Sequence, residues 1–173
     1  MLRSLSILVL IISMPAVAWS ANAVRSAGNF GIGLGAGTFA TGISMKYFLQ
    51  QSLSIQGNVG WWRGTFHRFG KYRYYYGGGD NSLALSADLL FEQPSFAGNQ
   101  AVKVAWEIGG GIGLGLEELG NDVGLGATFV IGIEINIDAA PVDVVLEYRP
   151  GFYVLPRFAL DLINITGHIR YYF

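Results

Sequence analysis

The sequence predicts an all-β fold: an eight-stranded antiparallel up-and-down transmembrane β-barrel that follows a cleaved signal peptide. Two observations concern composition. Hydrophobic residues make up 51% of the 173 residues and charged residues only 13%, about half the charged share of a typical soluble domain. No run of about 18 apolar residues occurs, so spanning helices are not expected, and a closed barrel is the other fold that satisfies every backbone group in lipid. The third observation is the alternation of apolar and polar residues in the stretch 158–173.

One face of this C-terminal stretch is apolar, and the other can form hydrogen bonds. The apolar face, on which only Gly167 is small, carries Ile163, Ile165, Ile169, Tyr171 and Phe173. The opposite face carries Asn164, Thr166, His168, Arg170 and Tyr172. This period of two is that of a β-strand. Since a tilted strand of about 9 to 11 residues crosses a bilayer, the stretch is long enough to span one.

Residues 1–23 have the organisation of an export signal, with an arginine near the start, an apolar centre at 5–12 and small residues after it. Two A-x-A cleavage sites compete, one ending at Ala18 and the other, which we favour, at Ala23. The predicted domains are therefore a signal peptide at 1–23 and one outer-membrane barrel domain at 24–173, because no linker or charge block divides the remaining chain.

The same alternation predicts four strands in the first half of this domain, at 29–37, 42–49, 53–63 and 82–91. In the first strand the apolar residues alternate with glycines, which suit the crowded inner face of a narrow barrel. The apolar positions of the four strands are, in order, Phe30, Ile32 and Leu34; Ile43, Met45 and Tyr47; Leu53, Ile55, Val59 and Trp61; and Leu83, Leu85, Ala87, Leu89 and Phe91.

Four more strands are predicted at 101–116, 124–137, 142–155 and 158–173. The apolar positions of the first three of these are Val102, Val104, Trp106, Ile108, Ile112 and Leu114; Leu125, Phe129, Ile131, Ile133, Ile135 and Ile137; and Val144, Leu146, Tyr148, Phe152 and Val154. Most connections are expected to be short turns. The two longer ones are 64–80, and 92–100 with its breakers Pro94 and Gly98.

The charged residues decide which face should line the interior. Nine charged side chains and one histidine share the polar face of these strands: Lys46, Asp88, Lys103, Glu107, Glu134, Asp143, Glu147, Arg149, His168 and Arg170. The four positive and five negative charges nearly balance, as ion pairs in a narrow lumen require. Aromatic residues of the apolar face fall near its two ends, as in the girdles of lipid-facing barrels: Phe30, Tyr47, Phe91, Tyr171 and Phe173 at one end, and Trp61 and Phe152 at the other.

An exported chain of this length with eight amphipathic strands and a terminal Tyr171-Tyr172-Phe173 resembles the small outer-membrane barrels of the OmpA and OmpX type. The segment 41–47 after a glycine-rich first strand is similar to members of this group that have no assigned activity. The resemblance implies an integral outer-membrane location. It also implies that Phe173, with Tyr171, is the signal that the barrel-assembly machinery reads, and that the loop 64–80 is extracellular.

The residues do not support an enzyme of this barrel class. Neither His67 nor His168 is followed two residues later by serine, as in the lipid A deacylases, and no Asp-Ser dipeptide of the palmitoyl transferases occurs. His168 could relay protons, but a hydrogen-bonded filler of the lumen is the favoured interpretation. The interior carboxylates Glu107, Glu134 and Glu147 could also bind a metal, but the cations on the same face favour ion pairing. Cysteine is absent, so thiolate metal sites and disulfides are excluded. We expect no cofactor.

The loop 64–80 is the most distinctive predicted surface because basic and aromatic residues alternate in and beside it. The binding candidates are Arg63, Phe66, Arg68, Lys71, Tyr72, Arg73, Tyr74, Tyr75 and Tyr76. Such residues could bind lipopolysaccharide phosphates, an anionic glycan or a host protein, with Tyr and Arg as anchors. The alternative is a hairpin that merely extends the strands. A net charge of −1 argues against a nucleic-acid partner.

Three functional hypotheses follow from the sequence. The leading one is a non-enzymatic, monomeric outer-membrane barrel that contacts lipid and lipopolysaccharide and acts structurally or in surface binding and adhesion through the loop 64–80. The alternative is a small pore or a lateral-diffusion channel for small or hydrophobic solutes, since the glycines at 31–35 and 109–115 could leave a partial cavity. A lipid A-modifying enzyme ranks third.

Overall fold

The computed structural model describes residues 24–37, 40–61, 83–116, 123–155 and 158–173. As the alternation predicts, these residues form strands and connections without a helix. The strands are β1 (Phe30–Gly37), β2 (Thr41–Gln50), β3 (Leu53–Trp61), β4 (Leu83–Glu92), β5 (Ala97–Gly98), β6 (Val102–Leu116), β7 (Val123–Ile137), β8 (Val142–Tyr148), β9 (Gly151–Leu155), β10 (Ala159–Asp161) and β11 (Ile165–Tyr172).

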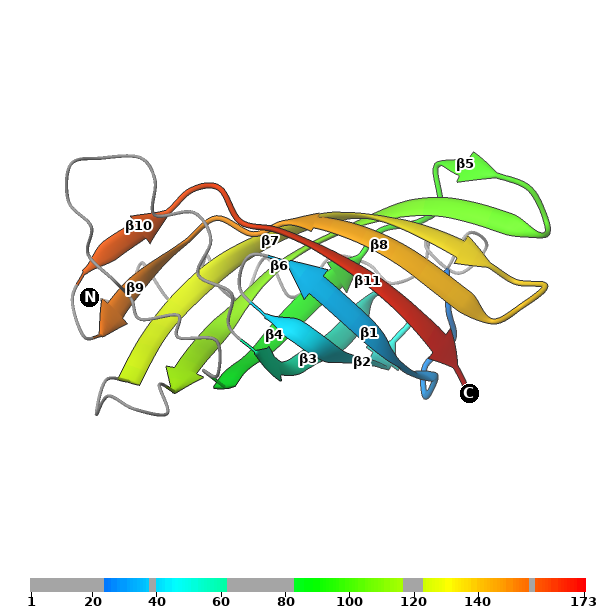
Figure 1. The fold of residues 1–173 in the computed structure, drawn as a ribbon. Helices are drawn as coiled ribbons and strands as arrows, with labels where there is room; N and C mark the ends of the chain where they lie inside the picture. Colours follow the sequence, from blue (N-terminus) through cyan, green and yellow to red (C-terminus); the bar gives the residue numbers. More distant parts are fainter. Residues whose placement is uncertain (1–23, 38–39, 62–82, 117–122, 156–157) are drawn as a thin grey trace.

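The strands close into an eight-stranded antiparallel barrel (Figure 1). Around the wall the order is β1, β2, β3, β4, β6, β7, β8 and β11, and pairing of β11 with β1 closes the ring. β9 continues β8 against β7, and β10 continues β11 against β9. We call the end of the barrel where β1 begins and β11 ends the lower end; there Phe173 N donates to Phe30 O at 2.9 Å.

Two strands that were predicted to be continuous, 142–155 and 158–173, are each interrupted once. Pro150 separates β8 from β9, because proline has no N–H for the ladder. Opposite this break, residues 162–164 separate β10 from β11. Hydrogen bonds from Arg149 N to Asn164 O (2.7 Å) and from Phe129 N to Pro150 O (2.8 Å) bridge the gap. Each predicted strand therefore keeps its place in the wall as two shorter strands.

The predicted connection 92–100 also needs correction. Glu92 is the last residue of β4 and lies opposite Glu107 in the ladder, so the polar residue continues the strand. Within the connection, Ala97 and Gly98 form the short strand β5 beside β6. The strand β4 therefore ends at Glu92, one residue later than the predicted end at 91.

The two faces of the wall are opposite in character to those of a water-soluble barrel. Apolar side chains point outward and are exposed, among them Leu34 (71%), Leu146 (61%) and Ile169 (59%). The inward face is largely polar, and its side chains are almost completely buried. The apolar part of the inner face is small and consists of Phe48, Ala84, Leu90, Ala105, Val130, Val145, Tyr153 and Tyr172.

Glycines of the inner face let neighbouring strands approach closely. A Cβ atom added to Gly33 would lie 1.9 Å from the carbonyl oxygen of Ile169, and one added to Gly109 would lie 2.1 Å from that of Leu89. Both distances are far shorter than any van der Waals contact. The space beside these residues is therefore filled by backbone, and these glycines permit the tight curvature of a small barrel rather than leaving a cavity.

Candidate functional site: the charged interior

The polar face of the strands forms a network of ion pairs and hydrogen bonds inside the barrel. Its charged members come from β2, β4, β6, β7, β8 and β11, where alternation directs them inward, and from Arg149 in the break between β8 and β9. Lys46, Glu107, Glu134, Asp143, Glu147 and Arg170 are completely buried. Burying a charge is costly unless it is paired and hydrogen-bonded, so the contacts of each group decide what the interior can do.

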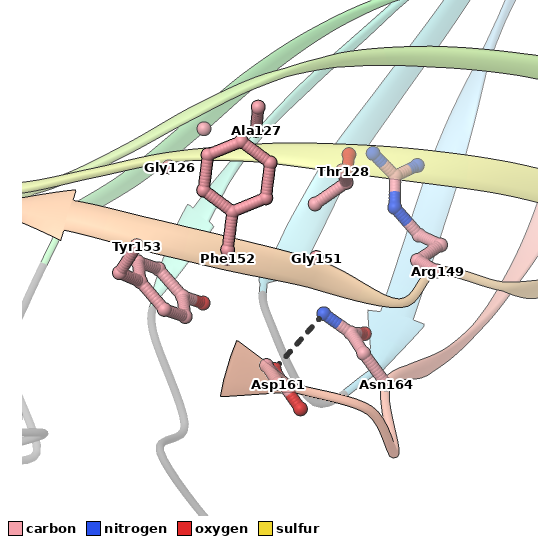
Figure 2. Close-up of a pocket in the computed structure, with 10 residues that line it drawn as sticks. Gly126, Ala127, Thr128, Arg149, Gly151, Phe152, Tyr153, Asp161 and Asn164 are labelled. Atoms are coloured by element: carbon pink, nitrogen blue, oxygen red, sulfur yellow. Dashed lines mark hydrogen bonds between the residues drawn. The ribbon is translucent and has the colours of Figure 1, made fainter. Parts of the chain in front are cut away.

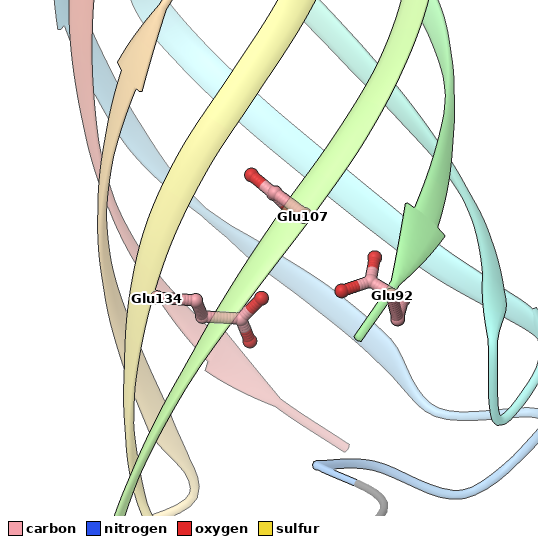
Figure 3. Close-up of side chains that lie close together, drawn as sticks. All are labelled: Glu92, Glu107 and Glu134. Atoms are coloured by element: carbon pink, nitrogen blue, oxygen red, sulfur yellow. The ribbon is translucent and has the colours of Figure 1, made fainter. Parts of the chain in front are cut away.

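The lowest part of the network surrounds Lys46. Its Nζ lies 2.9 Å from Glu92 Oε1, 2.6 Å from Glu107 Oε2 and 2.9 Å from Glu134 Oε2. Figure 3 shows the three carboxylates, which come from β4, β6 and β7. Ser54 Oγ donates a short hydrogen bond to Glu92 Oε1. Gly132 has no side chain, and the carboxylate of Glu107 lies against it.

These three glutamates have the composition of a site for a hard cation. One carboxylate oxygen from each lies within 4.8 Å of the others, and oxygen ligands of this kind suit Ca²⁺ or Mg²⁺. However, the ammonium group of Lys46 already contacts all three carboxylates. The arrangement is therefore an ion-pair cluster with its own cation, and it includes Glu92 in place of the Glu147 that the sequence suggested.

Above this cluster, Arg149 joins two further carboxylates. Its Nη2 donates to Asp88 Oδ1 at 2.6 Å and its Nη1 to Glu147 Oε2 at 2.7 Å. His168 Nε2 lies 3.2 Å from the same Glu147 oxygen. His168 Nδ1 faces Gly35, where a Cβ atom would come within 2.7 Å of it. The histidine is thus held inside the network between β8 and β1.

Arg170 and Gln56 extend the group held by Arg149. The guanidinium of Arg170 contacts Asp143, with Nη2 2.8 Å from Oδ2, and Tyr172 Oη donates to the same oxygen at 2.7 Å. Gln56 accepts a short hydrogen bond from Arg170 Nη1 and donates through Nε2 to Glu147 Oε1 at 2.8 Å. One amide therefore links the Asp143–Arg170 pair to the group held by Arg149.

Lys103 does not join this network. Its side chain is 30% exposed at the lower end, where Nζ pairs with Asp138 Oδ2 at 2.9 Å. The expected near-balance of charge therefore does not hold. Among the described residues, six carboxylates are buried, three more than the three buried Lys and Arg side chains. The carboxylates are Asp88, Glu92, Glu107, Glu134, Asp143 and Glu147, and the cations are Lys46, Arg149 and Arg170.

A small cavity lies at the upper side of the network (Figure 2). Its volume is about 10 Å³, close to the minimum for a single water molecule. Gly126, Thr128, Arg149 and Tyr153 are among the residues that line it. Asn164 also lines it and donates to Asp161 at 3.5 Å. The cavity is too small for an organic substrate.

The other predicted site residues are of two kinds. The candidates of the long loop, Arg63, Phe66, Arg68, Lys71, Tyr72, Arg73, Tyr74, Tyr75 and Tyr76, lie outside the described residues. Tyr171 and Phe173 are exposed at the lower end, with ring centroids 5.0 Å apart.

Sequence reasoning missed Glu92, Gln56 and Arg25 as parts of the interior and its lower mouth. Glu92 could have been found by continuing the alternation of the fourth strand by one residue, since Asp88 and Glu92 are four residues apart and therefore face the same side of the strand. Gln56 alternates with the apolar positions Ile55 and Val59 of its strand and so belongs to the polar face, but an uncharged amide gave no sign of its linking position. No sequence signal indicated that Arg25 would fold back toward the barrel.

Comparisons with protein-family models, with curated proteins and with solved structures found no match to this chain. Within the part of the chain that the structure describes, no helix has the length and hydropathy needed to cross a membrane. The resemblance to small outer-membrane barrels therefore rests on the strand pattern and the closed barrel alone.

Proposed function

We propose that this chain is a non-enzymatic integral outer-membrane β-barrel that acts structurally or in surface binding. The observation that carries the proposal is the inversion of the barrel. Exposed apolar side chains cover the outside of the described wall, while the charged groups are buried within it. In water, exposed apolar surface costs about 25 cal/mol per Å², whereas in lipid the same surface is favourable.

The apolar side chains of the outer surface are also arranged in bands, as on a lipid-facing wall. Phe30, Tyr47 and Tyr171 are exposed near the lower end, and Trp61 and Phe152 are exposed toward the other end. Aliphatic side chains lie between these aromatic groups, including Leu34 and Leu146. Aromatic girdles on both sides of an apolar band are typical of transmembrane barrels. Closure of the sheet satisfies the backbone hydrogen bonds that lipid cannot.

A substitution on the outer face tests the membrane placement. Arginine in place of Leu146 is expected to cost about 2–4 kcal/mol if this position faces the bilayer midplane, and to lower the folded fraction in lipid vesicles. Gln51→Lys, in the exposed turn between β2 and β3, is the matched control and should fold like wild type. Folded protein that is freely soluble without detergent would refute the proposal.

Surface binding is assigned to the loop 64–80, which joins the end of β3 to the start of β4. Its support is the alternation of basic and aromatic residues. The test is to replace residues 65–79 with a short Gly/Ser turn and to measure the binding of lipopolysaccharide vesicles and of host extracellular proteins to both forms. Equal binding by both forms would remove the basis for an adhesive function.

The alternative of a pore receives less support from the geometry. Of the glycine residues that could have left a cavity, Gly33 and Gly109 lie against neighbouring backbone and Gly31 and Gly35 against side chains. Long side chains such as Lys46, Gln56 and Arg170 fill the interior. The remaining alternative, a lipid A-modifying enzyme, predicts an altered lipid A profile on overexpression. We expect that profile to be unchanged.

A further inference from the structure

The segment 24–29 folds back against the lower end of the barrel. Gly28 N donates to Phe48 O at 2.8 Å, and Phe48 N donates to Asn29 O at 3.0 Å. Asn29 Nδ2 reaches Phe173 O at 3.4 Å, and the Asn29 side chain also accepts from Ser26 N at 3.0 Å. The segment is thereby tied to β2 and to the C-terminus, and it presents Arg25 to the lower mouth of the barrel.

The guanidinium of Arg25 has three contacts in this mouth, each with a different strand. It lies over the ring of Tyr172 on β11, with Cζ 4.4 Å from the ring centroid. Nε donates to Asn136 Oδ1 on β7 at 3.2 Å, and Nη2 donates to Val142 O on β8 at 3.2 Å. A planar cation is therefore stacked on an aromatic face and hydrogen-bonded at its edge, which is the geometry that distinguishes guanidinium from ammonium.

The surroundings of this position favour a positive charge. Tyr172 donates to Asp143 and packs edge-on against Phe48, with ring centroids 6.0 Å apart. Behind these two rings lies the buried network, whose nearest carboxylate is that of Asp143. The aromatic face of Tyr172 and the oxygen acceptors of Asn136 and Val142 all favour a cation at the mouth.

We propose that the lower mouth is a guanidinium-binding site that the chain fills with its own Arg25. The site accepts the guanidinium group of an arginine side chain from another molecule when the segment 24–29 leaves. None of the contacting atoms of the site belongs to this segment: the ring, the amide oxygen and the main-chain oxygen come from β11, β7 and β8. Removal of Arg25 therefore leaves the site formed. This inference goes beyond the surface binding proposed for the loop 64–80.

The test is chemical rescue of the full-length variant Arg25→Ala in detergent micelles. We expect this variant to unfold at a lower temperature than wild type. Methylguanidinium chloride should raise the midpoint temperature of thermal unfolding back toward that of wild type. The rise should saturate with a dissociation constant on the order of 10 mM, as expected for so small a ligand. At about ten times that concentration the expected rise is about 3–6 °C. Methylammonium should raise the unfolding temperature of the variant by less, and neutral urea should only lower it.

Two further proteins separate a binding site from a general salt effect. Wild type should show no saturable rise in unfolding temperature with methylguanidinium, because its own Arg25 occupies the site. The double variant Arg25→Ala with Asn136→Ala should bind methylguanidinium about tenfold more weakly in calorimetric titration, since one charge-assisted hydrogen bond is lost. The proposal is overturned if Arg25→Ala shows no saturable response, or if wild type responds equally. A tenfold change in affinity is measurable even if the double variant is less stable.

Discussion

At the scale of single residues, Lys46 is the group on which the lower network depends. One ammonium contacts three carboxylates within 2.9 Å, and all four groups lie inside the barrel, away from water. Three carboxylates placed this close together repel one another strongly when no cation lies between them. Lys46 therefore determines whether Glu92, Glu107 and Glu134 can share one level of the barrel.

Replacement of Lys46 by methionine is expected to cost about 3–5 kcal/mol of folding free energy, because it leaves buried charges unpaired. Lys103→Met is the matched control. Lys103 also pairs with a carboxylate at 2.9 Å, but both partners are about one-third exposed, so its loss should cost no more than about 1 kcal/mol. Urea unfolding of both variants in lipid vesicles, followed by tryptophan fluorescence, measures the two costs. Similar costs would show that the Lys46 cluster is not a stabilising ion-pair core.

The sequence predicts the direction of these side chains better than their height in the barrel. Parity along each strand assigns Lys46, Glu107 and Arg170 to the inner face, and all three are buried there. It also assigns Lys103 to that face, but Lys103 lies beyond the lower edge of the network, where solvent reaches it. Height depends on the stagger of neighbouring strands, which alternation does not specify. For the same reason the charge balance of the interior could not be obtained from the sequence.

At the scale of strands, glycine allows β1 and β6 to fit into a narrow wall. Gly33 on β1 faces Arg170 on β11, and the carbonyl oxygen of Ile169 occupies the space where its side chain would be. Gly167 on β11 differs, because a Cβ atom there would have no contact closer than 3.7 Å. These two glycines therefore serve as a natural pair for testing close strand approach.

Gly33→Ala is expected to destabilise the barrel by roughly 1–3 kcal/mol or more, because the added methyl group can be accommodated only by moving backbone. Gly167→Ala should change stability by less than about 1 kcal/mol, since the methyl group makes only ordinary van der Waals contacts and restricts the unfolded chain. Migration of unheated and heated samples in gel electrophoresis measures the folded fraction of each variant. Equal folding of both would mean that the inner glycines are not needed for strand approach.

The positions of the strands were largely predictable, whereas their interruptions were not. Each of the eight predicted segments corresponds to one position in the wall. Pro150 was visible in the sequence, yet the ladder on either side of it continues through Arg149 N and Phe129 N. Whether a proline ends a strand or only interrupts it depends on whether neighbouring strands bridge the gap. That information lies in the pairing, not in the local sequence.

At the scale of the whole molecule, the interior consists of packed levels from the lower mouth upward. Arg25, Phe48 and Tyr172 lie at the mouth. The ion-pair cluster of Lys46 follows, and the groups held by Arg149 lie beyond it. An eight-stranded barrel is just wide enough for side chains to fill. The charged face of the strands thus serves as the packed core of the barrel, and the apolar face serves as its contact with lipid in the proposed placement.

This filled interior predicts that the purified protein forms no steady ion channels in planar lipid bilayers, because the buried side chains of Lys46, Gln56 and Arg170 are held across the interior by hydrogen bonds and ion pairs. The chain offers a control, since replacing residues 65–79 by a Gly/Ser turn removes the long loop and leaves these side chains in place. Both forms should therefore be closed. Steady channels from both would mean that the polar core opens in the membrane and would favour the pore. Channels from the shortened form alone would show that the loop, rather than the ion-paired core, closes the barrel.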